Sequence, residues 1–256
     1  MRVKHLYKIA LLLFLAVAQW ACNGENAPDC FQNAGEITRE AVTVPDFSKI
    51  TVFENVTLVL RQGETLAVEI ETGAFLRPEV SAVVEGDRLV LRDANDCNFF
   101  RDFGLTVVYV TAPNITEIRS STGFPISSDG VLAYPELTLL SESFVNPETV
   151  TTDGSFDLEL NTERVSITSN GIAFFKLSGT ANNLNVSIAA GDSRVEAEAL
   201  TATNVTLNHR GSNDIRIRPQ ESLTGVIRGT GDVVSFTRPA TVAVEELFTG
   251  SLIFRD

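Results

Sequence analysis

Apolar and polar residues alternate along most of the chain after residue 22, which is the pattern of β-strands with one buried face. Glycine, proline, asparagine and aspartate punctuate the alternating segments and mark turns. No segment of this region has a helical period of apolar residues. The strands expected in the first half are 37–44, 54–63, 66–72, 87–93 and 105–113, with a hairpin turn at Gly86–Asp87. The pattern predicts an all-β fold.

The second half of the chain repeats with a period near 20 residues. The turn sequence GTGDVV (229–234) recurs in weakened form as GSNDI (211–215) and GDSRV (191–195), and a short alternating strand follows each time. One such unit cannot bury its apolar residues alone, whereas stacked units can. The sequence therefore predicts a single-stranded right-handed β-helix of about 20 residues per coil, preceded by an N-terminal set of β-strands. We expect the coils to begin near residue 115.

The glycines of this repeat have two interpretations. A phosphate-binding loop would need a helix directly after the glycines, and the segment VVSFTRPA is not a helix start. A tight corner needs glycine for positive φ and aspartate for local backbone hydrogen bonds, which fits better. The residues predicted to form the coil turns are Gly191, Asp192, Gly211, Asp214, Gly229, Gly231 and Asp232.

The N-terminus has the pattern of a targeting segment. Basic residues precede the apolar run 9–18, which is too short to span a bilayer as a helix. The run is followed by Ala21 and Cys22, so residues 1–21 resemble a lipoprotein signal peptide that leaves Cys22 acylated. Gln19 and Trp20 depart from the usual signal, and cleavage after Ala18 would instead give a secreted protein. Residues 22–35 would be a tether, followed by one domain over 36–256.

The number of cysteines and the net charge indicate the cellular compartment and the kind of partner. If Cys22 carries lipid, Cys30 and Cys97 remain to form a disulfide in an oxidising envelope; the alternative is two buried free thiols. The formal net charge is −13, and loss of the three basic residues in 1–21 makes it −16. Such a charge argues against nucleic acid as a partner. The expected partners are the membrane, through the lipid, and surface glycans or proteins.

Several of these segments together resemble one known family. The segments 47–64 and 105–123, the turn GTGDV, and the sequences around Cys30 and Cys97 are similar to those of the putative autotransporter adhesin, head GIN domain family. The family occurs often in surface lipoproteins of Bacteroidota. The resemblance implies a β-helix-like fold at the outer membrane or cell surface, and it implies no established reaction or cofactor. The turns GSNDI and TGFPI depart from the family pattern.

Residues for catalysis are scarce. The only histidine after residue 22 is His209, which we expect at a solvated strand end. Asp192, Asp214 and Asp232 could converge as paired acids of a β-helix carbohydrate-active enzyme, or hold calcium, but capping of their own turns is the simpler interpretation. We expect no catalytic residue, metal or cofactor. A column of arginines (Arg194, Arg216, Arg218 and Arg228) is expected on the solvent face opposite these acids.

Aromatic residues offer a binding alternative. The segment NFFRDF places Phe99, Phe100, Arg101 and Phe103 in one loop, where they could stack on sugars or dock a protein. They could also plug the open end of the β-helix. We therefore predict a non-catalytic, adhesin-like envelope lipoprotein that binds glycan or protein. The alternatives are a β-helix carbohydrate-active enzyme and a purely structural envelope protein.

Overall fold

The computed structural model describes residues 29–95, 97–99, 101–145 and 148–255 of the chain. This described part is all-β, and no helix in it is long and apolar enough to cross a membrane. Seventeen strands form one sheet, and two 3-10 turns, η1 (Asp29–Phe31) and η2 (Arg77–Glu79), accompany them. The strands are β1 (Ile37–Val42), β2 (Lys49–Val52), β3 (Val56–Gln62), β4 (Ala67–Gly73), β5 (Val80–Glu85), β6 (Arg88–Asp93), β7 (Thr106–Ala112), β8 (Glu117–Ser120), β9 (Pro125–Leu132), β10 (Glu136–Ser141), β11 (Ser155–Ser169), β12 (Phe174–Ile188), β13 (Arg194–His209), β14 (Ile215–Ile227), β15 (Val233–Ser235), β16 (Thr241–Glu246) and β17 (Leu252–Phe254).

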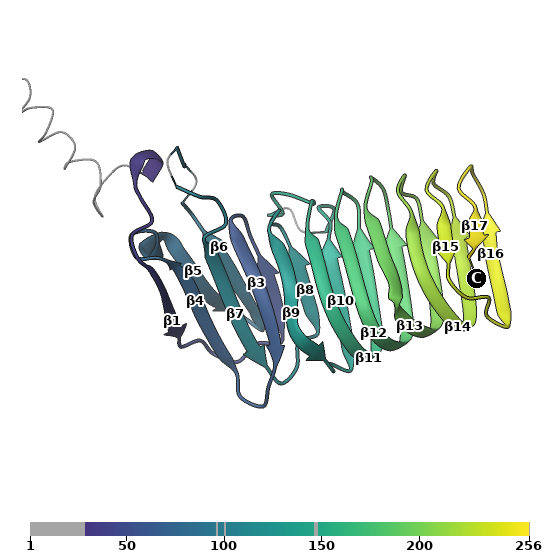
Figure 1. Cartoon of the computed structure of the whole chain (residues 1–256), viewed down its shortest axis with the longest axis horizontal. Coiled ribbons are helices and arrows are strands. Elements are labelled where there is room, and N and C mark those ends of the chain that lie inside the picture. The colour runs from purple at the N-terminus through teal and green to yellow at the C-terminus, as the bar shows by residue number, and fades with distance from the viewer. Residues whose placement is uncertain (1–28, 96, 100, 146–147, 256) are drawn as a thin grey trace, which may run out of the picture.

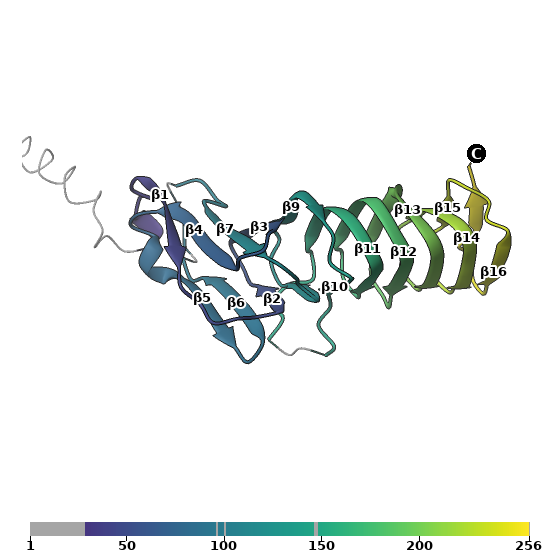
Figure 2. The same cartoon turned by 90° about the horizontal axis from the view of Figure 1, so that it is seen from below.

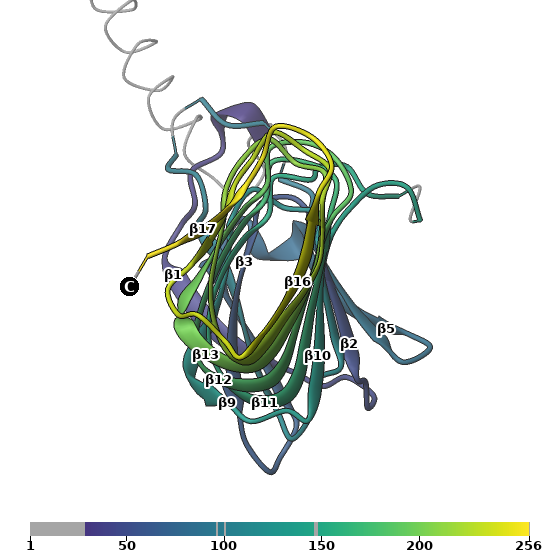
Figure 3. The same ribbon diagram turned by 90° about the vertical axis from the view of Figure 1, so that its right-hand side faces the viewer.

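The long strands β11 to β14 give the second half its regular appearance. Each pairs in parallel with the next, and partner residues lie 17 to 21 positions apart in the sequence. Seen end-on, each strand descends one side, bends, and returns on the other, so the sheet is nearly closed on itself like a flattened barrel (Figure 3). Short turns join the strands at one edge, and the bends lie at the opposite edge (Figure 1).

The core lies inside this flattened barrel. Alternate residues of each arm point inward, and the parallel register places chemically similar residues above one another. Val195, Ile215 and Val233 are paired across three successive strands and are fully buried. This confirms the stacking of successive units that the 20-residue period predicts.

The parallel stack begins earlier than the expected position near residue 115. β2 pairs in parallel with β8, and β3 pairs in parallel with β9. Lys49 and Glu117 are partners although 68 positions separate them, because β4 to β7 are inserted between the two coils. This insertion hides the period from the sequence.

The inserted strands extend the sheet at the N-terminal end, to the left in Figures 1 and 2. β4 pairs antiparallel with both β1 and β7, and β5 and β6 form an antiparallel hairpin. Gly86 has φ of +65° at the tip of this hairpin, as the sequence predicts. The strand predictions for 37–44, 54–63, 66–72, 87–93 and 105–113 match β1, β3, β4, β6 and β7.

Candidate functional site

A polar groove crosses the bends of four consecutive coils. It has a volume of about 500 Å³ and lies where β9 passes into β10 and where β11, β12 and β13 bend. Pairing aligns Asn161, Thr180 and Thr201 in one row across the three long strands. Since neighbouring strands lie about 4.8 Å apart, the groove presents similar groups at a regular spacing. Its lining residues are Ala133, Pro135, Asn161, Thr162, Glu163, Thr180, Ala181, Asn182, Thr201 and Thr203.

Small residues at the inner side of the bends make this shape possible. Thr162 and Ala181 are register partners, Ala202 follows Ala181 on the next strand, and all three point into the core. Short side chains let each strand change direction without leaving a large void. The residues on either side of this inner row then point outward into the groove.

Hydrogen bonds between coils hold the groove side chains in place. The hydroxyl of Thr180 donates to Oδ1 of Asn161 at 3.0 Å, and Nδ2 of Asn182 donates to the carboxylate of Glu163. The hydroxyl of Thr162 donates to the carbonyl of Tyr134 at 2.6 Å and so joins two coils below the groove. The polar lining is therefore positioned before any ligand arrives.

The groove is polar and, apart from Glu163, its described lining is uncharged. Amide and hydroxyl groups dominate, and the described lining contains one carboxylate, Glu163, and no basic side chain. Amides and hydroxyls can both donate and accept hydrogen bonds. Such a surface suits an uncharged ligand rich in hydroxyl groups better than an anion or a strongly apolar partner.

The predicted aromatic loop does not form a comparable pocket. Phe99 and Phe103 are 68% and 74% exposed, so they do not plug the end of the sheet as the capping alternative supposed. Phe100 lies outside the described residues. The cavity behind the loop, lined by Arg101 and Phe103 among others, measures only about 30 Å³, which is the space of about one water molecule.

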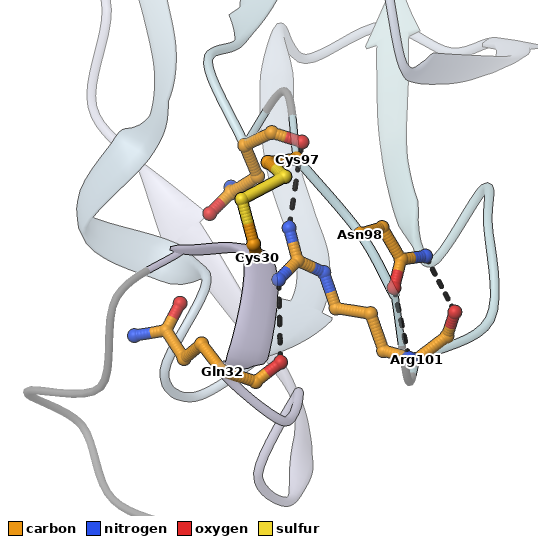
Figure 4. The surroundings of a disulfide bond; sticks show 6 residues. Cys30, Gln32, Cys97, Asn98 and Arg101 are labelled. Atoms are coloured by element: carbon orange, nitrogen blue, oxygen red, sulfur yellow. Dashed lines mark hydrogen bonds between the residues drawn. A yellow bond between two sulfur atoms is a disulfide. The ribbon is translucent and has the colours of Figure 1, made fainter. Parts of the chain in front are cut away.

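Arg101 serves the architecture of this loop. Its guanidinium donates to the carbonyls of Gln32 and Asn95, at 3.3 and 3.4 Å, and its backbone N–H donates to Oδ1 of Asn98 (Figure 4). The arginine thus crosslinks the loop to the N-terminal segment.

The disulfide between Cys30 and Cys97 is confirmed, and it joins these same two segments (Figure 4). Part of the predicted tether belongs to the folded body, since Phe75 donates its N–H to the carbonyl of Ala34. Cys22, the predicted lipidation residue, lies outside the described residues, as do the signal segment 1–21 and residues 23–28.

The aspartates of the coil turns bond to the next coil, and not to their own turns. Asp192 accepts a hydrogen bond from the Ser212 hydroxyl at 2.8 Å. Asp214 accepts from the backbone N–H of Asp232 at 3.1 Å, and Asp232 accepts from that of Ser251 at 2.8 Å. Each carboxylate therefore ties successive turns together. Among the residues that the structure describes, no group of three His, Cys, Asp or Glu side chains could hold a metal ion.

The turn glycines are needed mainly because the turns stack closely. Of the four predicted glycines, only Gly191 has the expected positive φ, at +82°. At Gly229 and Gly231 a Cβ would lie 2.1 Å from the carbonyl oxygens of Gly211 and Asn213. At Gly211 it would lie 2.8 Å from the Ile188 side chain. The recurrence of glycine thus reflects backbone contact between coils more than the conformation of each corner.

The sequence led us to expect His209 at a solvated strand end, and this prediction is wrong. The residue is fully buried, and its ring nitrogens face the backbone of Asn213 and Gly231 without a well-formed hydrogen bond among the described residues. Burial lowers its pKa below the usual 6.5, although the backbone of Asn213 and Gly231 and the carboxylates of Asp214 and Asp232 partly oppose this. A buried neutral imidazole without access to solvent is not a catalytic base for an external substrate.

Three members of the arginine column, Arg194, Arg216 and Arg218, contact glutamates of β13. Arg216 contacts Glu198 at 3.2 Å and Glu196 at 3.7 Å, and Arg194 also pairs with Glu196. Nε of Arg218 donates to the carbonyl of Glu198. These contacts form a ladder of ion pairs and hydrogen bonds along the stack.

The groove is the feature that sequence reasoning missed. Its residues are ordinary asparagine and threonine in strands, and no motif marks them. The available signal is the register: Asn161, Thr180 and Thr201 recur at spacings of 19 and 21 residues, so extending the repeat to mid-strand positions would have aligned them.

Comparison with known proteins agrees with the resemblance noted in the sequence. A model of the family described as "Putative auto-transporter adhesin, head GIN domain" matches residues 46–239. No curated protein matches the chain.

Solved structures with the same fold cover 87% of this chain. A putative adhesin from Bacteroides fragilis has a TM-score of 0.74 at 19% identity, with 99% of that chain covered. A putative adhesin from Parabacteroides merdae has a TM-score of 0.60 at 17% identity, with 97% covered. A putative lipid binding protein from Parabacteroides distasonis has a TM-score of 0.59 at 12% identity, with 98% covered. At these identities the likeness shows a shared fold.

Proposed function

Because this chain belongs to the head GIN domain family of putative auto-transporter adhesins, we propose that it is a non-catalytic, adhesin-like lipoprotein of the cell envelope that binds an extended, uncharged glycan. The glycan occupies the groove at the coil bends. The observation that carries this proposal is the lining of amide and hydroxyl groups, which recurs at the bends of β11, β12 and β13. A volume of about 500 Å³ lies within the usual range of ligand sites, about 300–1,000 Å³.

The lining favours a glycan over a protein partner. Energetically important protein contacts are usually aromatic or arginine side chains in dry pockets. The groove has neither kind of side chain among its described residues. Sugar hydroxyls, in contrast, match side chains that donate and accept at once, such as Asn161, Asn182 and Thr201.

The stack of parallel coils also supports the finer fold proposal, a right-handed β-helix. Its regular strand pairing keeps the groove rigid, so a ligand would lose little affinity to ordering of the site. A repeating polymer could then bind with equivalent contacts on successive coils.

The test uses a soluble form that starts at Asn23. It is incubated with a panel of bacterial and host polysaccharides, with and without calcium, and both retention and new chain ends are measured. Thr180→Arg and Thr201→Arg place a long side chain in the groove at exposed positions, and each should weaken retention at least about tenfold. Thr206→Arg, on the other arm of β13, is the matched control and should retain wild-type binding.

Each other outcome identifies a different function. New chain ends would indicate a carbohydrate-active enzyme, and the absence of any retained polysaccharide would favour a structural envelope protein. Binding that survives both groove variants but is lost in the Phe99→Ser/Phe103→Ser double variant would move the site to the aromatic loop.

The lipid anchor is a separate part of the proposal. Cys22 follows an apolar run and Ala21, which supports cleavage before Cys22 and its acylation. Mass spectrometry of the protein purified from bacterial membranes should find Cys22 as an acylated N-terminus. The Cys22→Ser variant should lose acylation and membrane association together. A wild-type N-terminus at Gln19 would instead support cleavage after Ala18 and secretion.

A further inference from the structure

Three exposed phenylalanines belong to the two segments that the disulfide joins: Phe31 follows Cys30, and Phe99 and Phe103 follow Cys97 in one loop. Phe31 is 48% exposed, Phe99 68% and Phe103 74%. The rings of Phe31 and Phe99 are 5.8 Å apart, and we call these three residues the phenylalanine patch. Large apolar side chains grouped in this way on a surface commonly mark a contact with another body.

The patch is held firmly on the folded protein. The backbone N–H of Phe99 donates to the carbonyl of Cys30 at 3.1 Å, one residue before Phe31. The disulfide and the hydrogen bonds of Arg101 fix the same two segments to each other (Figure 4). A contact through these rings would therefore cost little ordering of the backbone.

The patch also lies close to the proposed anchor in the sequence. Eight residue steps join Cys22 to Cys30, and an extended chain spans at most about 3.5 Å per residue, so the two are within about 28 Å of each other. The opposite end of the molecule, with β16 and β17, lies a full molecular length away (Figure 1). A bilayer that holds acylated Cys22 is therefore within reach of the phenylalanine patch.

We propose that the phenylalanine patch inserts into the interface of the bilayer that holds the lipid anchor. This inference rests on the proposed acylation of Cys22. The anchor keeps the patch at a high effective concentration at the membrane, so even a modest apolar contact is occupied. Insertion buries phenylalanine surface that folding leaves in water, and it fixes the N-terminal end against the bilayer.

The charge of the protein indicates which bilayer suits this contact. The formal net charge is −13 for the whole chain and −16 without residues 1–21, and Asp102 lies exposed beside Phe103. Repulsion from an anionic surface would oppose the approach. A zwitterionic phosphatidylcholine bilayer is therefore the appropriate probe.

Tryptophan fluorescence can test the contact directly. Trp20 is the only tryptophan of the chain and is lost with the signal segment, so Phe103→Trp gives the mature protein a single reporter in the patch. The acylated variant is reconstituted in vesicles of brominated phosphatidylcholine, whose bromine quenches tryptophan that enters the bilayer. Phe248→Trp, at a 63% exposed position at the far end, is the matched control. Most of the emission of Phe103→Trp should be lost, and that of Phe248→Trp should be unchanged.

Flotation with the vesicles and the mass of the N-terminus are measured on the same samples. A protein that is acylated and floats, but whose Phe103→Trp emission is not quenched, overturns the patch proposal and leaves the anchor standing. A protein that lacks acylated Cys22 and does not float overturns the anchor and with it the patch. Equal quenching of the two tryptophan variants also overturns the patch, because it shows no preferred end.

Discussion

The rings of Phe156 and Phe175 lie nearly parallel, with centroids 4.9 Å apart and planes inclined by 7°. The two residues are register partners on β11 and β12, and both are fully buried. A spacing of this size matches the distance between neighbouring strands, so the rings stack because the coils stack. Core packing therefore helps to fix the register between β11 and β12, in addition to the backbone hydrogen bonds.

Truncation of this stack should therefore be costly. We expect Phe175→Ala to lower the free energy of unfolding by about 3–5 kcal/mol, because it leaves a cavity between two coils and removes the ring contact. Urea denaturation checks this value. Phe248→Ala removes the same ring from an exposed site and should change stability by less than about 0.5 kcal/mol. Similar losses in the two variants would contradict a core role for the stacked pair.

Gly231→Ala tests the explanation of the turn glycines by close stacking. The added methyl group would lie 2.1 Å from the carbonyl oxygen of Asn213 and 2.7 Å from Nε2 of His209. We expect a loss of about 2–3 kcal/mol in urea denaturation, since backbone atoms must move apart. Gly86→Ala is the control, because a Cβ there meets nothing within 4 Å and only its positive φ, +65°, adds strain of about 1 kcal/mol. Equal losses would favour corner conformation over stacking.

These glycines also show what the sequence could and could not predict. The 20-residue recurrence of glycine, aspartate and a β-branched residue located the turns and the buried row of Val195, Ile215 and Val233. It did not reveal which physical requirement each glycine meets, because positive φ and close approach select the same residue type. Nor did it reveal that the turn aspartates reach the next coil, since their partners lie 18 to 20 positions away.

Two other features depended on contacts that no local pattern encodes. The pairing of Lys49 with Glu117 is hidden by the inserted strands, so the first coil could not be recognised from periodicity. The groove is formed where strands bend, and its threonines and asparagines resemble those of any exposed strand. His209 was misjudged for a similar reason: it ends a strand in sequence, while the following turns cover it in space.

The buried ion pair of Arg119 and Glu142 should respond differently to single and double substitution. The two side chains are 8% and 2% exposed, and Glu142 also accepts hydrogen bonds from the N–H groups of Phe144 and Val145. Burial alone would raise the pKa of Glu142, but the hydrogen bond from Arg119 and these N–H groups outweigh it, so the pKa is lowered.

Arg119→Met should cost about 3–5 kcal/mol, because it leaves the Glu142 carboxylate buried without its partner. The double variant Arg119→Met/Glu142→Gln should recover much of that loss, since no unpaired charge remains. Thermal and urea unfolding of the single and double variants provide the comparison. If the double variant is as unstable as Arg119→Met, the cost comes from lost packing and hydrogen bonds, and not from the unpaired charge.

The disulfide should stabilise the N-terminal end of the molecule. Cys30 and Cys97 are 67 positions apart, so the bond closes a long loop in the unfolded chain. We expect the Cys30→Ser/Cys97→Ser double variant to lose about 2–4 kcal/mol. Limited proteolysis should then cut first in the segment around Phe99, while β11 to β14 stay protected. First cleavage within the long strands would show that the bond supports the whole stack.

His209 should make stability depend on pH in a range where few other groups titrate. Its pKa is lowered in the folded protein, chiefly by burial, whereas the unfolded chain has the ordinary value near 6.5. Above that value the imidazole is neutral in both states and costs nothing. As the pH falls below about 6.5, the unfolded chain takes up a proton that the folded protein refuses, so stability decreases by at most about 1.4 kcal/mol per pH unit. Asp214 and Asp232 face the ring and moderate the effect.

Urea denaturation at intervals between pH 7.5 and 5 measures this slope. His209→Leu replaces the imidazole by an apolar side chain and should abolish most of the slope in this range, because carboxylates titrate mainly at lower pH. Its stability near pH 7 should change less than its stability near pH 5, because near pH 7 the imidazole is neutral in both states and makes no well-formed hydrogen bond that the leucine would lose. A slope that persists unchanged in His209→Leu would assign the pH dependence to other groups and show that the folded protein accommodates the imidazolium.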